Sequence, residues 1–219
     1  MQQLSVRDEQ DVKELIAQRN DPVTTRLVYE LLDLDQSQVQ QRIQHLSMLG
    51  DRYMVLALLR EDGQQDEQTV VSLLERRYRR ALSFLAPSSK RDERARAWYQ
   101  EAENVYSAAV RQSALSEQED SPSRKDTYAA YSHLAVARAV RGKLDLALVD
   151  LTQALNYADS AHQQAEVSYL RGLLSAQQEA FDLALVDFAY ALDLVPDSQM
   201  YREALDHTGA RLRARQLER

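Results

Sequence analysis

A stretch of six residues occurs twice in the chain without change. Asp145 to Asp150 reads Asp-Leu-Ala-Leu-Val-Asp, and Asp182 to Asp187 reads the same. In each copy a large apolar residue follows, and Ala-Leu comes three positions after it. A duplicated segment with helical spacing is typical of proteins built from stacked repeats. We therefore expect the second half of the chain to contain two copies of one helical hairpin, which favours binding over catalysis.

Helix-forming residues dominate the chain, and turn-forming residues are scarce. Only five Gly and four Pro occur among its 219 residues, whereas Ala, Leu, Gln, Glu and Arg are abundant. The helical spacing of apolar residues predicts helices in the second half over residues 128–140, 144–157, 165–178, 181–194 and 200–217. In the first half it predicts helices over residues 12–19, 23–34, 37–49, 52–60, 67–85 and 91–114. We therefore expect an all-α fold.

One segment has the composition of a linker. Residues 116–123 are polar and contain a Pro. We therefore expect three parts. These are a helical N-terminal module over residues 1–115, a linker over 116–126, and a repeat domain over 127–219 that ends in a capping helix.

Residues 128–217 resemble tetratricopeptide repeats, helical hairpins with the pattern W-x2-L-G-x2-Y, then A-x3-F, then P. The resemblance is carried by Tyr131, Leu134, Ala135, Ala147, Leu151 and Ala154 in the first copy, and by Gly172, Ala184, Phe188, Ala191 and Pro196 in the second. The sequence departs from the pattern at Arg138, Ser168, Arg171 and Ser175. The copies lie 37 residues apart, not the usual 34, which predicts a longer loop around residues 158–164. The resemblance implies a short α-solenoid of two hairpins and a capping helix.

The same resemblance implies a concave groove, lined by the first helix of each hairpin, that holds a segment of a partner protein. By position, its lining would be Ala129, Ser132, Val136, Ala139, Val140, Glu166, Tyr169, Leu173, Ala176 and Gln177. None of these is Lys, Asn or Arg, so the clamp that some family members use for an acidic C-terminus is missing. An apolar peptide or an amphipathic helix is therefore the expected partner, with Tyr169 as its aromatic anchor.

Residues 51–113 fit three interpretations. They resemble a J-domain in three stretches, residues 51–56, 78–88 and 99–106. The His-Pro-Asp loop of that family is here Ala86-Pro87-Ser88, so the resemblance implies an inactive module that docks on a heat-shock chaperone. Residues 78–87 and 97–104 also resemble parts of a decayed tetratricopeptide unit. A generic helical hairpin is the third interpretation.

The net charge of −7 disfavours general nucleic-acid binding, because contacts to phosphates need Lys and Arg. Residues 37–50 nevertheless resemble the recognition helix of winged-helix DNA binders, so a DNA-binding regulator acting through residues 23–50 is an alternative. Its glutamines would read adenine edges, but Arg42 is the only cation on that helix. The glutamines are Gln38, Gln40, Gln41 and Gln44.

One stretch of this acidic chain is basic. Between residues 76 and 96, eight basic side chains accompany only Asp92 and Glu93. They form either a solvated helix face or a contact surface for an acidic partner protein. The eight are Arg76, Arg77, Arg79, Arg80, Lys90, Arg91, Arg94 and Arg96.

No residue pattern in the chain is typical of catalysis. Cys is absent, which excludes disulfides and thiolate metal sites. None of the four His lies in a catalytic or metal-binding motif, and no glycine-rich phosphate loop occurs. Asp145, Asp150, Asp182 and Asp187 are expected to be solvated carboxylates opposite a core face. We therefore expect a non-catalytic adaptor or assembly factor, without cofactor or metal, that binds another protein.

Two further features bear on location. The first residues lack the profile of a secretory signal. The densest apolar run, residues 54–59, is too short to span a bilayer. A cytoplasmic protein without a membrane span is the expectation.

Overall fold

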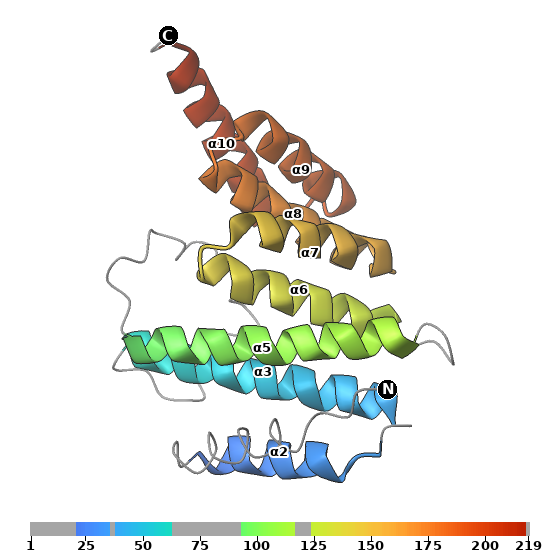
Figure 1. The fold of residues 1–219 in the computed structure, drawn as a ribbon. Helices are drawn as coiled ribbons and strands as arrows, with labels where there is room; N and C mark the ends of the chain where they lie inside the picture. The colour runs from blue at the N-terminus through green and yellow to red at the C-terminus, as the bar shows by residue number, and fades with distance from the viewer. Residues whose placement is uncertain (1–20, 36–37, 63–92, 117–123, 218–219) are drawn as a thin grey trace.

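The computed structural model describes residues 21–35, 38–62, 93–116 and 124–217, and every regular element in these ranges is an α-helix (Figure 1). The expected all-α class is confirmed for this part of the chain. The helices are α2 (Pro22–Asp33), α3 (Val39–Asp62), α5 (Glu93–Ser116), α6 (Arg124–Val140), α7 (Leu144–Tyr157), α8 (Ala161–Gln177), α9 (Phe181–Leu194) and α10 (Gln199–Leu217). The helices expected over residues 12–19 and 67–85 lie outside the described residues.

The helices form a stack in which each packs mainly on its neighbours in the sequence (Figure 1). α2 lies at one end, α3 and α5 lie side by side next to it, and α10 lies at the other end. One continuous cluster of buried apolar side chains runs from Leu27 on α2 to Tyr201 on α10. The two halves of the chain therefore share a core, and α6 begins at Arg124, within the segment assigned to the linker from the sequence.

A capping carboxylate ties α2 to α3. The Asp21 side chain accepts a hydrogen bond from the Thr24 backbone N–H at 2.9 Å and caps α2, which begins with Pro22. Arg52 on α3 donates to the same carboxylate, through Nη2 at 2.7 Å and Nε at 3.0 Å. Burial alone would raise the pKa of Asp21, but the hydrogen bonds from Arg52 and Thr24 outweigh it and lower that pKa to about 2. The carboxylate is therefore ionised and holds both helices.

α3 is one helix, and the break predicted between residues 49 and 52 is wrong. Gly50, which lies between the two predicted helices, is a packing residue inside α3. A Cβ there would overlap the Tyr106 ring of α5, so its absence lets the two long helices approach closely. Beside it, the Tyr106 hydroxyl donates to Asp51 Oδ1 at 2.6 Å. The glycine is thus explained by tertiary packing.

The two hairpins, α6–α7 and α8–α9, have the same turn. Gly142 in the first and Glu179 in the second take up positive φ angles of 77° and 60°. The next residue then donates its N–H across the turn, from Lys143 to the Arg138 carbonyl and from Ala180 to the Ser175 carbonyl, both at 2.9 Å. Matched turns at the repeat spacing make the hairpins structural copies of each other.

The loop between the hairpins is not long, so that prediction is wrong. α7 ends at Tyr157 and α8 begins at Ala161, after Ser160, which caps α8 by accepting from the Gln163 N–H. The first helices of the two hairpins begin at Arg124 and Ala161, at the same spacing as the hexapeptides. Residues 161–164, which were expected in the loop, therefore belong to α8, and the Ser160 side chain accepts from one of the N–H groups of its first turn.

Candidate functional site

The repeated hexapeptide has the same pattern of burial in both copies. Its central Ala, Ala147 or Ala184, is fully buried, and so is the large residue after it, Leu151 or Phe188. Gly172 of α8 lies under the Phe188 ring, where a Cβ would come within 2.6 Å of a ring carbon. α7 packs mainly against α6 and also contacts α8, whereas α9 packs against α8 and α10. One side of α7 and one side of α9 stay uncovered.

The uncovered sides are apolar. Leu146 and Leu183 are 47% and 64% exposed, and Val149 and Val186 are 57% and 67% exposed. Tyr190 on α9 is also exposed, so five of the eight exposed large apolar residues in the described chain lie on these two helices. Single exposed apolar residues are ordinary, whereas clusters of them are typical of interaction surfaces. We call these five side chains the outer face.

Helix geometry groups the three exposed apolar side chains of α9. Leu183, Val186 and Tyr190 have the spacing i, i+3, i+7, which puts them in one stripe along α9. Leu146 and Val149 repeat the beginning of this stripe on α7. The Tyr190 hydroxyl lies 3.4 Å from Gln164 Oε1 of α8, which orients its ring on the surface.

Only acidic charges accompany the outer face on its own helices. Asp145, Asp182 and Asp193 are exposed. Neither α7 nor α9 contains a Lys, Arg or His. Asp145 accepts one hydrogen bond, from Gln178 Nε2 at 3.0 Å. The charges that α7 and α9 themselves place beside the outer face are therefore all negative, while Arg215 of α10 lines a hollow together with Asp182.

The other two Asp of the hexapeptides are buried, which corrects the expectation that all four are solvated. Asp150 accepts from Arg138 Nη1 at 2.7 Å on both oxygens, and Asp187 accepts from Arg171 Nη2 at 2.5 Å and from Arg171 Nε. Both Arg residues are departures from the repeat pattern. Arg138 stands where the pattern has Tyr and Arg171 where it has Leu, and each supplies the cation that a buried carboxylate requires. An Arg that departs from the repeat pattern, together with the Asp that ends each hexapeptide, was the sequence signal that could have indicated these buried ion pairs.

The first of these ion pairs belongs to a larger network that ties the hairpin to α5. Glu103 of α5 is buried and accepts from Arg141 Nη1, and from Lys143 Nζ at 2.8 Å. Arg138 Nε lies 3.5 Å from the same carboxylate. Burial raises the pKa of Asp150 to about 6, although Arg138 partly offsets this. Sequence patterns did not identify Glu103, since Arg141 and Lys143 lie about 40 residues further along the chain, in the turn between α6 and α7.

The ten residues expected to line a groove are mostly covered. Leu173, Ala129 and Glu166 are partly exposed, and Gln177 is exposed. Tyr169 packs on the rings of Phe188 and Tyr201, at 5.7 and 5.1 Å between centroids. In this conformation, six of the ten are buried inside the chain and not presented to a partner: Ser132, Val136, Ala139, Val140, Tyr169 and Ala176.

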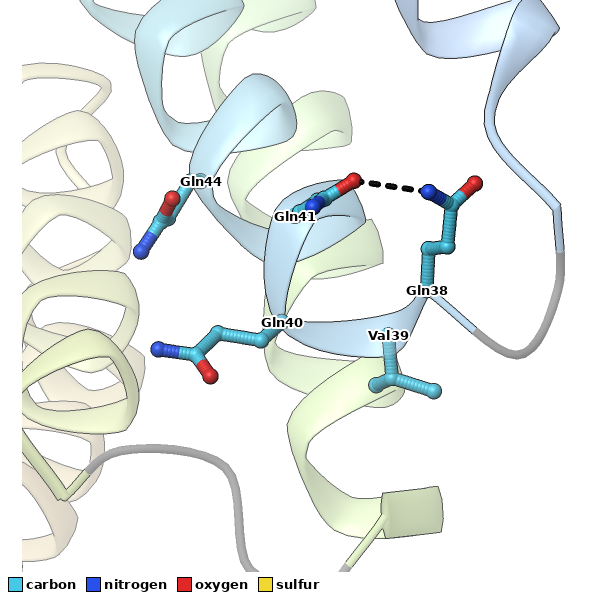
Figure 2. A pocket seen from close by; sticks show the side chains of 5 residues that line it. All are labelled: Gln38, Val39, Gln40, Gln41 and Gln44. Carbon is cyan, nitrogen blue, oxygen red and sulfur yellow. Dashed lines mark hydrogen bonds between the residues drawn. The ribbon is translucent and has the colours of Figure 1, made fainter.

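A hollow of about 390 Å³ lies at the start of α3 and contains the glutamines considered for DNA reading (Figure 2). Gln38 donates to Gln41 Oε1 at 2.9 Å, as Figure 2 shows. Gln40 and Gln44 both donate to Asp126 of α6, at 3.2 and 3.3 Å. These glutamines therefore make contacts within the chain, beside a carboxylate that would repel phosphate. The guanidinium of Arg42 on the same helix donates to the Leu34 carbonyl at 2.8 Å.

The basic surface falls largely outside the described residues. Residues 76–91 are not part of them, and neither is the side chain of Arg94, so only Arg96 is placed. Its side chain is exposed on α5. The surface for an acidic partner stays a prediction.

One cluster of titratable groups joins three helices. Asp51 of α3 accepts from the Tyr106 hydroxyl of α5, and its Oδ1 lies 3.2 Å from His133 Nδ1 of α6. The His133 ring meets the Tyr106 ring edge to face at 5.4 Å. Tyr106 is fully buried, so the cluster holds helices together. Within the described ranges no three His, Cys, Asp or Glu are grouped to hold a metal ion.

None of the described helices has the length and apolarity needed to cross a membrane. Comparison of the chain with protein-family models, curated proteins and solved structures found no match. The likeness to tetratricopeptide repeats therefore rests on the residues and hairpins of this chain alone.

Proposed function

We propose that this chain is a non-catalytic adaptor or assembly factor that binds a segment of a partner protein on its outer face. The proposal depends on one observation: the same apolar residues occur at matching exposed positions in both copies of the hexapeptide. Leu146 and Val149 recur as Leu183 and Val186, although in both copies they are exposed and contribute little to the chain's own packing. Binding of a partner protein that covers these side chains would explain why exposed apolar residues occur in both copies.

The energetics of such an interaction are favourable. Covering a Leu or Val side chain completely contributes about 1.5–3 kcal/mol, and the outer face has five large apolar side chains. Part of that gain offsets the entropy lost on association. Tyr190 adds an aromatic side chain of the kind that anchors partners at binding hot spots.

The rest of the molecule serves as a rigid support for this surface. α6 and α8 lie behind α7 and α9 and are fixed to them by the buried Asp150–Arg138 and Asp187–Arg171 pairs. The Glu103 network continues this support into α5. A surface whose backbone is already ordered binds without a large ordering cost.

The proposed partner is still a segment of another protein, but its binding site differs from the groove that the resemblance implies. The tetratricopeptide resemblance implies binding on the first helices of the hairpins, and the residues there are mostly buried. The outer face lies on the second helices instead. The inactive J-type module stays a prediction, because residues 78–88, which include its altered loop, lie outside the described residues. The DNA-binding helix is disfavoured by the contacts that its glutamines make with Asp126.

The test compares three forms of the full chain in affinity purification followed by direct binding of the identified partner. We expect Leu183→Asp with Val186→Asp to reduce partner binding at least tenfold, because two charges would be buried at the contact. Met48→Asp with Tyr29→Asp is the matched control, since these residues are 48% and 57% exposed on α3 and α2. Its binding should be unchanged. Circular dichroism should show all three forms equally folded. Retained binding by the Leu183/Val186 variant would refute the outer face as the site.

A further inference from the structure

We infer that the outer face takes an amphipathic α-helix whose apolar stripe is bordered by Lys or Arg. This inference rests on the proposed function and specifies the chemistry of its partner. It is carried by the three exposed carboxylates beside the apolar stripe and by the absence of any basic residue on α7 and α9.

The carboxylates lie beside the exposed apolar side chains of their own helices, and Arg215 of α10 lines a hollow with one of them, Asp182. Asp182 precedes Leu183 at the start of the stripe on α9, and Asp193 lies one turn beyond Tyr190 at its end. Asp145 holds on α7 the place that Asp182 holds on α9. All three lie within about a turn of the apolar side chains, well inside the Debye length of roughly 8–10 Å. A helix that covers the stripe therefore brings its flanking side chains into their field.

A helical partner fits this surface better than an extended one. The backbone N–H and C=O groups of α7 and α9 are used within the helices, so the surface offers no row of unpaired groups to an added strand. The side chains at i, i+3 and i+7 form a ridge, which packs into the groove between the ridges of another helix. An extended peptide would gain only scattered side-chain contacts.

Charge also discriminates between possible occupants. A second copy of the chain would place its own Asp182 and Asp193 opposite the same residues, and like charges at an interface cost affinity. An anionic lipid surface would be repelled for the same reason. A basic helix avoids both penalties and neutralises part of the chain's negative charge.

The experiment uses a display library of helical peptides of about 18 residues, which form roughly five turns. Leu is fixed at i, i+3, i+4, i+7 and so on, and the flanking positions are randomised among Lys, Glu, Gln and Ser. The library is selected on the full chain and counter-selected on the Leu183→Asp/Val186→Asp form. We expect selected peptides that bind only the native face and carry Lys at their flanks.

The outcomes separate the two proposals. Peptides that require Leu183 and Val186 but show no preference for Lys, or prefer Glu, would overturn the basic partner and leave the binding surface standing. A selection that yields no peptide able to distinguish the native chain from the variant would overturn the surface and this inference together.

A pair of variants then measures the electrostatic part. Replacing Asp182 and Asp193 by Asn should weaken a selected Lys peptide about fivefold at low salt, as expected for two exposed ion pairs. The loss should shrink in high salt. Asp206→Asn, an exposed residue of α10, is the control and should have no effect. Unchanged affinity in the double variant would overturn the inference.

Discussion

The two hairpins have the same turn and the same buried apolar positions, but different neighbours support them. The first shares its buried Asp150 with a network that reaches Glu103 on α5. The second keeps its Asp187 in a pair with Arg171. Its turn is held from the other side, by α10, where Arg215 donates to the Glu179 carbonyl at 3.0 Å. Repetition thus determines the hairpin, and position in the stack determines what supports it.

The turns of the two hairpins also differ in the neighbours that contact them. Gly142 adopts its positive φ in open space, with no atom near the place of a Cβ. Glu179 adopts the corresponding conformation with a side chain, which is unfavourable for a residue other than Gly. Arg215 contacts both its carbonyl and its carboxylate, the latter at 3.3 Å. The contact with α10 therefore distinguishes this turn from the turn at Gly142, where no atom lies near the place of a Cβ.

The largest effect should come from removing the cation of the second hairpin. Arg171→Leu leaves Asp187 buried without its partner, which costs about 3–5 kcal/mol of unfolding free energy. Arg138→Leu should cost less near pH 5 than near pH 8, because Asp150 with its pKa of about 6 accepts a proton more readily. Urea unfolding at the two pH values measures both. If Arg138→Leu lowers the free energy of unfolding equally at both pH values, protonation of Asp150 does not offset the lost cation.

The raised pKa of Asp150 should appear directly in the pH dependence of stability. The pKa is about 6 in the folded chain, against a reference value of 3.8. Between these values the folded state binds more protons than the unfolded state, so stability falls as pH rises from about 4 to about 6. The expected change is on the order of 2–3 kcal/mol. Asp150→Asn should lack this component, so the difference between native chain and variant, followed by urea unfolding, isolates it. A difference that does not vary with pH would rule out the raised pKa.

A smaller effect should come from exchanging packing residues between the copies. Gly172→Ala places a methyl group against the Phe188 ring and should cost about 1–2 kcal/mol, as overpacking does. Adding Phe188→Leu reproduces the Ala135 and Leu151 of the first hairpin, so the double variant should recover part of the loss. Thermal unfolding of the two single variants and the double variant gives the coupling. Strictly additive losses would show that the two hairpins do not use equivalent positions.

Much of the fold follows from the sequence because it depends on local spacing. The helices over residues 144–157 and 181–194 were predicted to the residue, since each has a regular apolar stripe and a defined beginning. The helix over residues 128–140 was predicted with a later start. The repeat itself indicated two equivalent hairpins, and their matched turns agree with it.

Only the tertiary structure decided which repeated residues are buried and which are exposed. Leu146 and Ala147 are both apolar and adjacent, yet Ala147 is fully buried and Leu146 is 47% exposed. Gly50 lies inside a continuous helix, where its lack of a Cβ leaves room for the Tyr106 ring of α5. Asp150 and Asp187 are buried because Arg138 and Arg171 come from another helix to meet them. The spacing of residues along one helix defines its faces. Which face is buried depends on contacts between segments that are distant in the sequence. The exposed side chains of the outer face could therefore not be assigned from the sequence of each helix alone.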